Sequence, residues 1–261
     1  MGSVRACQCP PAVVPLRRVS TDARGPASNL AQPIQSLPPQ AAAKGSLLPP
    51  RAEATGTLRR LQEAALIGFG ERGYHGVSIR DLATAVGVRV SSVYAHVSAK
   101  EDLLLELMVI GHEEHNELMR HALLASQPDP LAQMRALVGA HVRMHTAYPL
   151  LGRVCNKELH ALSAGNKERV MGTRLQSERM FLDVVNRGVE SGQFRCADPW
   201  LAVAAIGGMG VRVSEWFDPE GVRSHEDVAA VYSDFAVKLL GDSGAAPVAP
   251  AELGRRAQSS P

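Results

Sequence analysis

The sequence predicts an all-α protein. Apolar side chains recur at helical spacing in several stretches, as in the i, i+3, i+4, i+7 series Ile79, Leu82, Ala83 and Val86. Hydrophobic residues make up 45% of the chain but aromatic residues only 4%, so the core must be built mainly of Ala, Val and Leu, which suits closely packed helices. No run of eighteen apolar residues is present, and we therefore expect no membrane span.

Charge is distributed unevenly along the chain. The net charge is only +2, yet residues 1–100 carry 12 Lys and Arg against 5 Asp and Glu, whereas residues 101–261 carry 16 against 21. A basic front end and an acidic remainder are expected when only one end meets phosphates. The four cysteines, Cys7, Cys9, Cys155 and Cys196, have neither disulfide-framework nor metal-ligand spacing, which favours a reducing, cytoplasmic setting.

Both ends of the chain have the composition of disordered tails. Residues 1–52 hold nine of the seventeen prolines and no aromatic residue, so they bury too little surface to offset the entropy of ordering. Three alternatives stay open for this segment: a transit peptide, a misassigned start codon, and a basic arm that contacts phosphates through Arg5, Arg17, Arg18 and Arg24. Residues 242–261 are rich in Ala, Pro and Ser and are predicted to be loose.

Two helices are predicted between residues 57 and 86. The first spans 57–72 and ends at Gly73. The second spans 79–86, with Ser78 and Asp81 spaced as a capping box at its start. Gly87 ends it, because glycine adopts the left-handed C-cap conformation without strain.

The next segment, residues 89–97, is predicted to present a polar face. Val93 and Val97 are four residues apart and can pack back on the preceding helix. The residues left facing outward are Arg89, Ser91, Ser92, Ala95 and His96. Two short helices joined by a tight glycine turn form a helix-turn-helix, whose second helix fits the DNA major groove. The alternative is an ordinary helical hairpin within a core, but this outward face carries no Leu, Ile or Phe to bury.

The stretch from residue 58 to residue 107 resembles a known family. The segments GFGERGYHGVSIRDLATAVGV and SSVYAHVSAKEDLL are similar to the amino-terminal domain of the tetracycline-repressor (TetR) family of transcriptional regulators. Two positions depart from the family pattern: Val97 stands where most members have Phe, and residues 90–92 replace a glycine or a different small polar set. The second departure bears on which operator is read, not on whether one is read.

The resemblance implies a domain organisation and a mode of DNA binding. Residues 53–100 would form the helix-turn-helix DNA-binding domain, and residues 101–241 a helical effector-binding and dimerisation domain. A homodimer would place two reading helices in successive major grooves of a near-palindromic operator, about 34 Å apart. Phosphates would be contacted by Ser78, Tyr94, His96 and Lys100, and bases would be faced by Arg89, Val90, Ser91, Ser92 and Ala95.

Five further helices are predicted in the second domain. A long helix begins at Ser98, with Glu101 completing a capping box, and runs to residue 124 as the lever between the two domains. The other four are predicted over residues 131–146, 166–191, 199–217 and 225–240. Asp198 and Pro199 give a strong start signal for the helix over 199–217, and the glycines Gly207, Gly208 and Gly210 within it suit close helix approach.

No catalytic site is predicted. The chain has no nucleophile motif, no phosphate-binding loop and no metal triad, so we expect neither enzymatic activity nor a cofactor. The helix over residues 98–124 carries five polar residues that favour a solvated face, the commoner arrangement, over the alternative of a zinc site: His112, Glu113, His115, Glu117 and His121. His141 and His145 are four apart and are predicted to line or edge a core rather than to chelate.

An effector pocket and a dimer face are predicted in the same domain. The pocket would be lined by Met134, Val138, Met144, Tyr148, Leu151, Phe181 and Val185, for which simple core packing is the alternative. If the effector is an acyl-CoA, its phosphates would meet Arg153, Lys157, Arg169 or Arg174, which are otherwise surface residues. The dimer face would comprise Trp200, Ala204, Gly208, Val211, Val228, Tyr232 and Phe235.

These features together predict a bacterial, cytoplasmic and nucleoid-associated repressor. It binds a palindromic operator as a homodimer and is released by a small apolar or acyl-CoA-like effector or another lipid metabolite, through a population shift between two dimer forms. A weaker similarity of YPLLGRVCNKELHAL and the terminal helices points to regulators of lipid, fatty-acid or steroid breakdown. The alternative is a non-specific, architectural DNA-binding protein without effector control.

Overall fold

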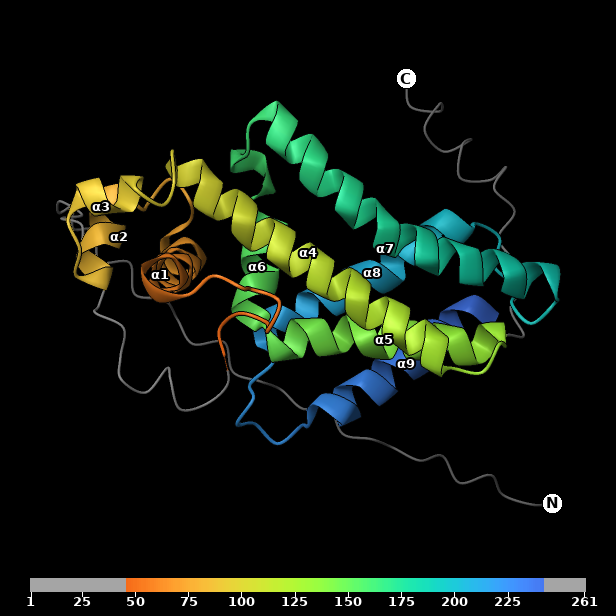
Figure 1. Ribbon diagram of the computed structural model, residues 1–261. Helices are drawn as coiled ribbons and strands as arrows, with labels where there is room; N and C mark the ends of the chain where they lie inside the picture. The colour runs from red at the N-terminus through yellow and green to blue at the C-terminus, as the bar shows by residue number, and fades with distance from the viewer. Residues whose placement is uncertain (1–45, 242–261) are drawn as a thin grey trace, which may run out of the picture. The chain divides into compact units, whose positions relative to one another are not determined.

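The computed structural model describes residues 46–241, and every regular element in that range is a helix (Figure 1). The elements are α1 (Gly56–Arg72), α2 (Ile79–Val86), α3 (Val90–Tyr94), α4 (Lys100–Ala125), α5 (Pro130–Ala147), α6 (Pro149–Lys157), the 3₁₀ turn η1 (Leu159–Ala161), α7 (Ala164–Glu190), α8 (Pro199–Trp216) and α9 (His225–Gly241). The predicted all-α fold class is confirmed. The predictions for residues 1–45 and 242–261 lie outside the described residues.

The end of the predicted amino-terminal tail packs onto the first helix. Leu48 is fully buried, and Ala52 is buried as well. Arg59 of α1 donates to the carbonyl of Ala52 at 3.1 Å and to the Ser46 hydroxyl at 2.9 Å. Residues 46–52 are therefore an ordered part of the helical unit, because one buried leucine and one arginine hold them.

Both predicted ends of α2 are present in the α1–α2–α3 unit. The Ser78 hydroxyl accepts from the Asp81 amide at 3.1 Å, and the Asp81 carboxylate accepts from the Ser78 amide at 2.8 Å, which completes the capping box. Gly87 has a φ of 70° and ends α2 in the left-handed conformation. Val88 then donates to the Ala83 carbonyl at 2.9 Å, which turns the chain into α3.

One hydrophobic core joins this unit to the following helices. Phe69, Leu82 and Val93 are buried together with Leu103 and Leu107 of α4, and residues of α6 complete the cluster. Figure 1 shows α1, α2 and α3 beside the first turns of α4. The structure shows one core that spans residues 48–170, and the domain boundary near residue 100 stays a prediction.

Helix α4 begins at Lys100 and not after Ser98. Its N-cap is Ala99, which has no side-chain acceptor, so only half of a capping box forms. Asp102 accepts from the amides of Ser98 and Ala99 at 2.9 and 2.8 Å. The predicted capping pair of Ser98 and Glu101 is therefore wrong by one residue: the pattern points to Ser98, but the helix begins after Ala99 with Asp102 as the acceptor.

A second core lies among α5, α7, α8 and α9. Its members include Met134, Val138, Val185, Ile206 and Leu240, all of them buried. Helix α5 packs against α9, α4, α8 and α7, which makes it the central element of this part (Figure 1). Asp129 and Asp198 cap α5 and α8 by accepting from amides three residues further on, at 2.9 and 3.0 Å.

Gly210 allows α8 to approach α5 closely. A Cβ atom at Gly210 would lie 2.0 Å from Cδ2 of His141, so no other residue fits there without movement. The neighbouring Gly207 and Gly208 have no such contact within 4 Å. The expectation of close helix approach thus holds for one of the three glycines. Among residues 46–241, no helix is long and apolar enough to cross a membrane.

Candidate functional site

Helix α3 exposes the face that the sequence predicts. Val93 and Val97 are buried at 0% and 5% exposure, and Val97 donates to the Val93 carbonyl at 3.1 Å. The exposed residues are Arg89, Val90, Ser91, Ser92, Tyr94, Ala95 and His96. The helix itself has only five residues, shorter than the predicted segment, and residues 95–97 leave it as a turn. The structure therefore brings seven of the nine predicted DNA contacts onto one exposed surface.

Ser78 and Lys100 both have partners within the protein. The Ser78 hydroxyl accepts from the Asp81 amide but keeps its own proton for a further acceptor. The Lys100 ammonium donates to the carbonyls of Tyr74 and Val77 at 2.8 and 2.7 Å, and it lies 3.9 Å from the centre of the Tyr74 ring. Burial lowers the pKa of Lys100. Lys100 thus fastens α4 to the turn before α2, and its predicted phosphate contact stays a prediction.

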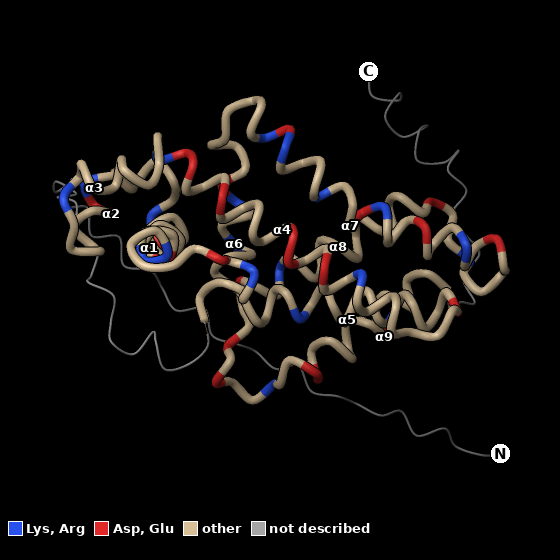
Figure 2. The backbone as a smooth tube through the Cα atoms, viewed as in Figure 1, with Lys and Arg blue, Asp and Glu red and all other residues tan. Residues whose placement is uncertain are grey.

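Charged residues of both signs occur throughout the described helices. Figure 2 shows acidic and basic positions interspersed along α4, α7 and their neighbours. Residues 46–100 carry seven Lys and Arg against four Asp and Glu, so this end keeps a modest basic surplus. The Arg89 guanidinium forms no hydrogen bond or ion pair within residues 46–241, which leaves it available on the α3 surface.

A cavity of about 370 Å³ lies between α4, α5, α6, α7 and α8. One part of its wall is apolar and includes Met144, Phe181 and Val203. The polar part contains four of the nine histidines of the chain, together with one arginine; these residues are His112, His115, His141, His145 and Arg174. The volume is at the lower end of the range for ligand pockets, about 300–1,000 Å³.

The histidine rings are in contact with one another. The ring centres of His115 and His141 are 4.9 Å apart, and those of His141 and His145 are 4.7 Å apart. His115 Nε2 lies 2.9 Å from His141 Nδ1, and His141 Nε2 lies 3.0 Å from the carbonyl oxygen of Gly207. His145 Nδ1 donates to the His141 carbonyl at 2.9 Å.

Burial keeps these imidazoles neutral near pH 7. It lowers the pKa of His112 to about 4 and that of His141 to about 3, and it lowers the pKa of His115 well below 6.5. The pKa of His145 is lowered for the same reason. The positive charge of Arg174 also lowers the pKa of all four histidines, so Arg174 is a charged neighbour that they have in common.

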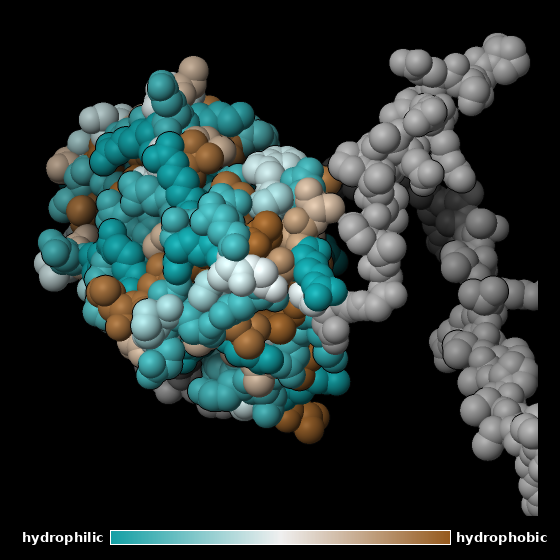
Figure 3. Space-filling model, turned by 90° about the vertical axis from the view of Figure 1, so that its right-hand side faces the viewer, coloured by the Kyte–Doolittle hydropathy of each residue, from teal (hydrophilic) through white to brown (hydrophobic). Residues whose placement is uncertain are grey.

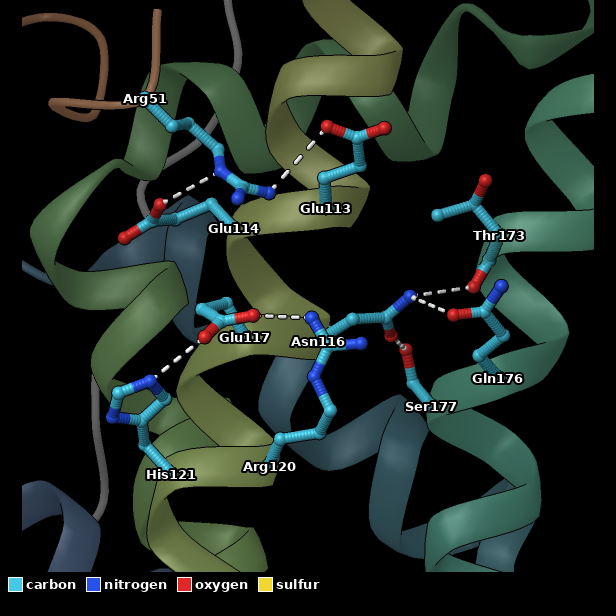
Figure 4. A network of polar contacts seen from close by, with 10 residues as sticks. All are labelled: Arg51, Glu113, Glu114, Asn116, Glu117, Arg120, His121, Thr173, Gln176 and Ser177. Carbon is cyan, nitrogen blue, oxygen red and sulfur yellow. Dashed lines mark hydrogen bonds and ion pairs between the residues drawn. The ribbon is translucent and has the colours of Figure 1, made fainter.

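A polar network joins α4 to α7 beside the cavity (Figure 4). The Asn116 amide nitrogen donates to the Thr173 carbonyl at 2.9 Å and to Gln176 Oε1 at 3.3 Å. Its amide oxygen accepts from the Ser177 hydroxyl at 2.5 Å. Because both donors and the acceptor of Asn116 are used, the proton of the Ser177 hydroxyl is directed at Asn116.

The structure separates the predicted pocket residues. Met144 and Phe181 line the cavity. Met134, Val138 and Val185 are buried in the second core, whereas Leu151 and Tyr148 belong to the first core. Sequence reasoning missed the histidines as a wall, although the spacing of His141 and His145 had singled them out.

The predicted cations, and the residues of the zinc alternative, do not gather at one site. Only Arg174 lines the cavity; Lys157 pairs with Glu215 at 3.2 Å, and Arg169 is exposed on α7. Glu117 pairs with His121 at 2.7 Å on the surface of α4 (Figure 4). Within residues 46–241 no group of three or more His, Cys, Asp and Glu side chains has the arrangement of a metal site.

Helices α8 and α9 each expose large apolar side chains, and we call these residues together the α8/α9 face. Its large members are Trp200, Leu201, Trp216, Val231, Phe235 and Leu239. The predicted dimer residues Trp200, Ala204, Gly208 and Phe235 are exposed, but Val228 is 3% exposed and packs in the second core of its own chain, which argues against a place for Val228 in a dimer interface. Val211 and Tyr232 are half-buried. On the side of the molecule seen in Figure 3, by comparison, hydrophobic side chains gather in separate patches on a mainly hydrophilic surface.

Helix α8 contributes residues both to the cavity wall and to the surface of the molecule. Trp200, Ala204, Gly208 and Val211 lie one or more helical turns apart on α8, and all four line the cavity. The Trp200 indole donates to Glu178 of α7 at 3.1 Å. A change in the cavity wall is therefore also a change in the exposed surface of α8.

Comparisons with known proteins agree with these features. Residues 61–107 match the family described as bacterial regulatory proteins, tetR family, and residues 127–240 match the tetracyclin repressor-like C-terminal domain. The HTH-type transcriptional repressor KstR2 of Rhodococcus jostii is 26% identical over 193 residues, which is 71% of this chain and 94% of that protein.

Solved structures extend the match over nearly the whole described range. The TetR family regulator PfmR of Thermus thermophilus is 31% identical, with a TM-score of 0.62 over 69% of this chain and 97% of that one. A tetR family regulatory protein of Rhodococcus is 25% identical, with a TM-score of 0.67 over 73% of this chain and 100% of that one. Two family models match this chain, and it covers almost all of a relative that is more than 30% identical. This chain therefore belongs to the TetR family of bacterial transcriptional regulators.

Proposed function

We propose that the protein is a homodimeric repressor that reads an operator with α3 and releases it when a small molecule fills the histidine-lined cavity. The observation that supports this most strongly is the polar α3 surface, in which seven exposed residues surround a buried Val93. The relative KstR2 of Rhodococcus jostii is named a transcriptional repressor, which supports the sign of regulation. The protein would act in the bacterial cytoplasm, where nucleoid DNA lies.

Base recognition in this proposal depends on the residues at the start of α3. Arg89 precedes the helix, and Ser91 and Ser92 form its first exposed turn. An arginine can donate two hydrogen bonds to a guanine, and serine hydroxyls bond either bases or phosphates. Tyr94 and His96 at the far end of this surface would contact phosphates and fix the register.

The α8/α9 face is the proposed dimer interface. Exposed aromatic and aliphatic side chains on two neighbouring helices are unfavourable in water, and burial against a second copy removes them from it. Twofold pairing would present two α3 helices to successive major grooves. Of the predicted interface residues, Phe235 is the exposed aromatic residue on α9.

Helix α4 offers the route from the cavity to the reading helix. Its first turns carry Leu103 and Leu107 in the core of the α1–α3 unit, and two later turns carry His112 and His115 in the cavity wall. A ligand that moves these histidines would move the helix against which α1, α2 and α3 pack. The cavity has an apolar wall, so the effector would be a small apolar molecule, the acyl part of a CoA thioester or another lipid metabolite.

The experiment uses a DNA duplex recovered by selection on the purified full-length protein. Sedimentation of the complex should give two protomers per recovered duplex. Addition of acyl-CoA thioesters, fatty acids and steroid acids to a fluorescence anisotropy assay should then identify a compound that dissociates the complex. A complex with one protomer per duplex, or one that no compound dissociates, would contradict the proposal.

A further inference from the structure

The hydrogen bonds along the wall of the histidine-lined cavity require an extra proton, and a bound anion would stabilise that proton. Ser177, His115, His141 and Gly207 form one row of polar contacts along its wall. Ser177 Oγ lies 3.2 Å from His115 Nδ1, and the ring-to-ring and ring-to-carbonyl distances that follow are 2.9 and 3.0 Å. Each of these distances is within hydrogen-bond range.

The row needs more protons than two neutral rings supply. The Ser177 proton is directed at Asn116, so Ser177 accepts from Nδ1 of His115. The Gly207 carbonyl can only accept, so Nε2 of His141 must also carry a proton. The bond between the rings requires a third proton, but two neutral imidazoles carry one proton each. All contacts are therefore satisfied only when the His115–His141 pair holds one extra proton.

Without a nearby anion the extra proton is not retained near pH 7. Burial lowers the pKa of both His115 and His141, and Arg174 lowers them further. The neutral row then places two lone pairs against each other at one contact, which is unfavourable in a buried site. An added negative charge beside the row would stabilise the protonated pair.

Among the remaining titratable groups in the cavity wall, one is a carboxylate and the others are neutral. Burial raises the pKa of the Cys155 thiol on α6 to about 12, so this group is neutral. Glu178 on α7 is the one carboxylate in the wall and accepts from the Trp200 indole. The histidines His112 on α4 and His145 on α5 are neutral, and the lining residues of α8 include no titratable side chain.

Two polar side-chain groups in the wall have no hydrogen-bond partner within residues 46–241. His112 Nε2 is buried without a hydrogen bond within residues 46–241. The Arg174 guanidinium lines the cavity and forms no hydrogen bond or ion pair with the part of the chain that the structure describes. A guanidinium binds a carboxylate through two parallel hydrogen bonds, and a protonated imidazole nitrogen donates to carboxylate oxygens as well.

We propose that the cavity binds an organic acid, with its ionised carboxylate on Arg174 and His112 and its apolar body against Met144, Phe181 and Val203, and that binding transfers one proton from solvent to the His115–His141 pair. This inference rests on the proposed function, because the acid would be the effector that occupies this cavity. It narrows the ligand from apolar molecules in general to those with a free carboxylate. A CoA thioester of a monocarboxylic acid has no free carboxylate on its acyl group and would lack this contact.

The test is calorimetric titration of the full-length dimer at pH 7 with straight-chain carboxylates of four to ten carbons and with their methyl esters. We expect at least one acid of the series to bind at least tenfold more tightly than its ester. Titration in two buffers of different ionisation enthalpy should show uptake of close to one proton per acid bound. These acids are fully ionised between pH 6 and 8. Weaker binding at higher pH would therefore reflect loss of the proton from the His115–His141 pair and not a change in the ligand.

Variants on α7 separate charge recognition from loss of fold. Arg174→Gln should weaken acid binding at least tenfold and leave ester binding unchanged, whereas Arg174→Lys should retain part of the affinity. Arg169→Gln removes an exposed arginine of the same helix that does not line the cavity, and it should bind acids as the parent does. Matching circular dichroism and operator binding would show that all three variants are folded.

The outcomes distinguish this inference from the proposed function. Equal binding of acids and esters, an absence of proton uptake, or no binding by any acid in the series would overturn the carboxylate assignment. If a CoA thioester or a neutral lipid then dissociated the operator complex, the proposed effector control would stand with a different ligand. If no compound dissociated the complex, the proposed effector control itself would fail.

Discussion

The Lys100 ammonium lies 3.9 Å from the centre of the Tyr74 ring and donates to the Tyr74 carbonyl at 2.8 Å. A second bond to the Val77 carbonyl, at 2.7 Å, uses another of its protons. The first residue of α4 thus holds the turn that connects α1 to α2 through a cation–π contact and two charge-assisted hydrogen bonds. Lys100 therefore has a structural role that does not depend on contact with DNA.

Replacement of Lys100 by Met should destabilise the protein by about 1–3 kcal/mol, because the two carbonyls lose a charged donor. Affinity for every DNA sequence should fall with little change in the slope of log K against log salt. Thermal unfolding and salt-dependent anisotropy measure the two effects. Lys167→Met, at an exposed lysine of α7, is the matched control and should be neutral. A fall in the salt slope of about one without lost stability would instead assign Lys100 to a phosphate.

The capping box of α2 should make stability depend on acidity. Ser78→Ala should cost about 1 kcal/mol, since the Asp81 amide loses its acceptor. The hydrogen bond from the Ser78 backbone is the largest cause that lowers the pKa of Asp81 below its ordinary value of 3.8. The Asp81 contribution is therefore present above about pH 4 and is lost as pH falls through the lowered pKa. Urea unfolding should show Asp81→Asn less stable than the parent at pH 7, with a gap that closes toward pH 3; a constant gap would argue against this role.

Two glycines in helices should respond oppositely to alanine. Gly210→Ala should destabilise the protein by about 1–3 kcal/mol, because its Cβ would lie 2.0 Å from His141 Cδ2. Gly172→Ala, at an exposed position of α7 with nothing within 4 Å, should stabilise by up to about 1 kcal/mol through helix propensity. Chemical denaturation of both variants measures the difference. Equal effects would mean that α8 does not approach α5 as the structure has it.

The α8/α9 face should control assembly. Phe235 is 49% exposed on α9, so Phe235→Asp should leave the protomer folded but prevent apolar burial against a second copy. Sedimentation should show a monomer that binds operator DNA at least tenfold more weakly. Leu124→Asp, at a leucine of α4 that is 86% exposed and outside this face, is the control and should stay dimeric. A dimeric Phe235→Asp variant would remove the face from the proposed interface.

Local signals in the sequence were sufficient for most helix ends. Asp198 with Pro199, and Ser78 with Asp81, act through bonds to amides only a few residues away, so their spacing alone predicts them. The start of α4 was misplaced because Ser98 and Glu101 have capping-box spacing, whereas the actual N-cap, Ala99, carries no capping side chain. Only the fold shows that Glu101 instead accepts from the Ser163 amide before α7, at 2.8 Å.

The exposed face of α3 was predicted correctly for a similar reason. Val93 and Val97 lie four residues apart and are buried, which leaves the other residues of the segment exposed, Val90 and Ala95 included. The cavity could not be predicted in the same way, because His115 and His141 lie on different helices and meet only through tertiary packing. Apolar residues such as Met134 and Val185 look alike in sequence whether they line a cavity or fill a core, and here they fill a core.

The central claim is that two copies of α3 read DNA sequence. Selection of bound duplexes from a random pool by the full-length protein tests it most directly, with Arg89→Ala selected in parallel. The account predicts that the parent protein enriches two inverted half-sites whose centres are about 34 Å apart, and that Arg89→Ala relaxes one position in each half-site at a cost of about 1–3 kcal/mol. Recovery of unrelated sequences that bind no more tightly than random DNA would contradict it.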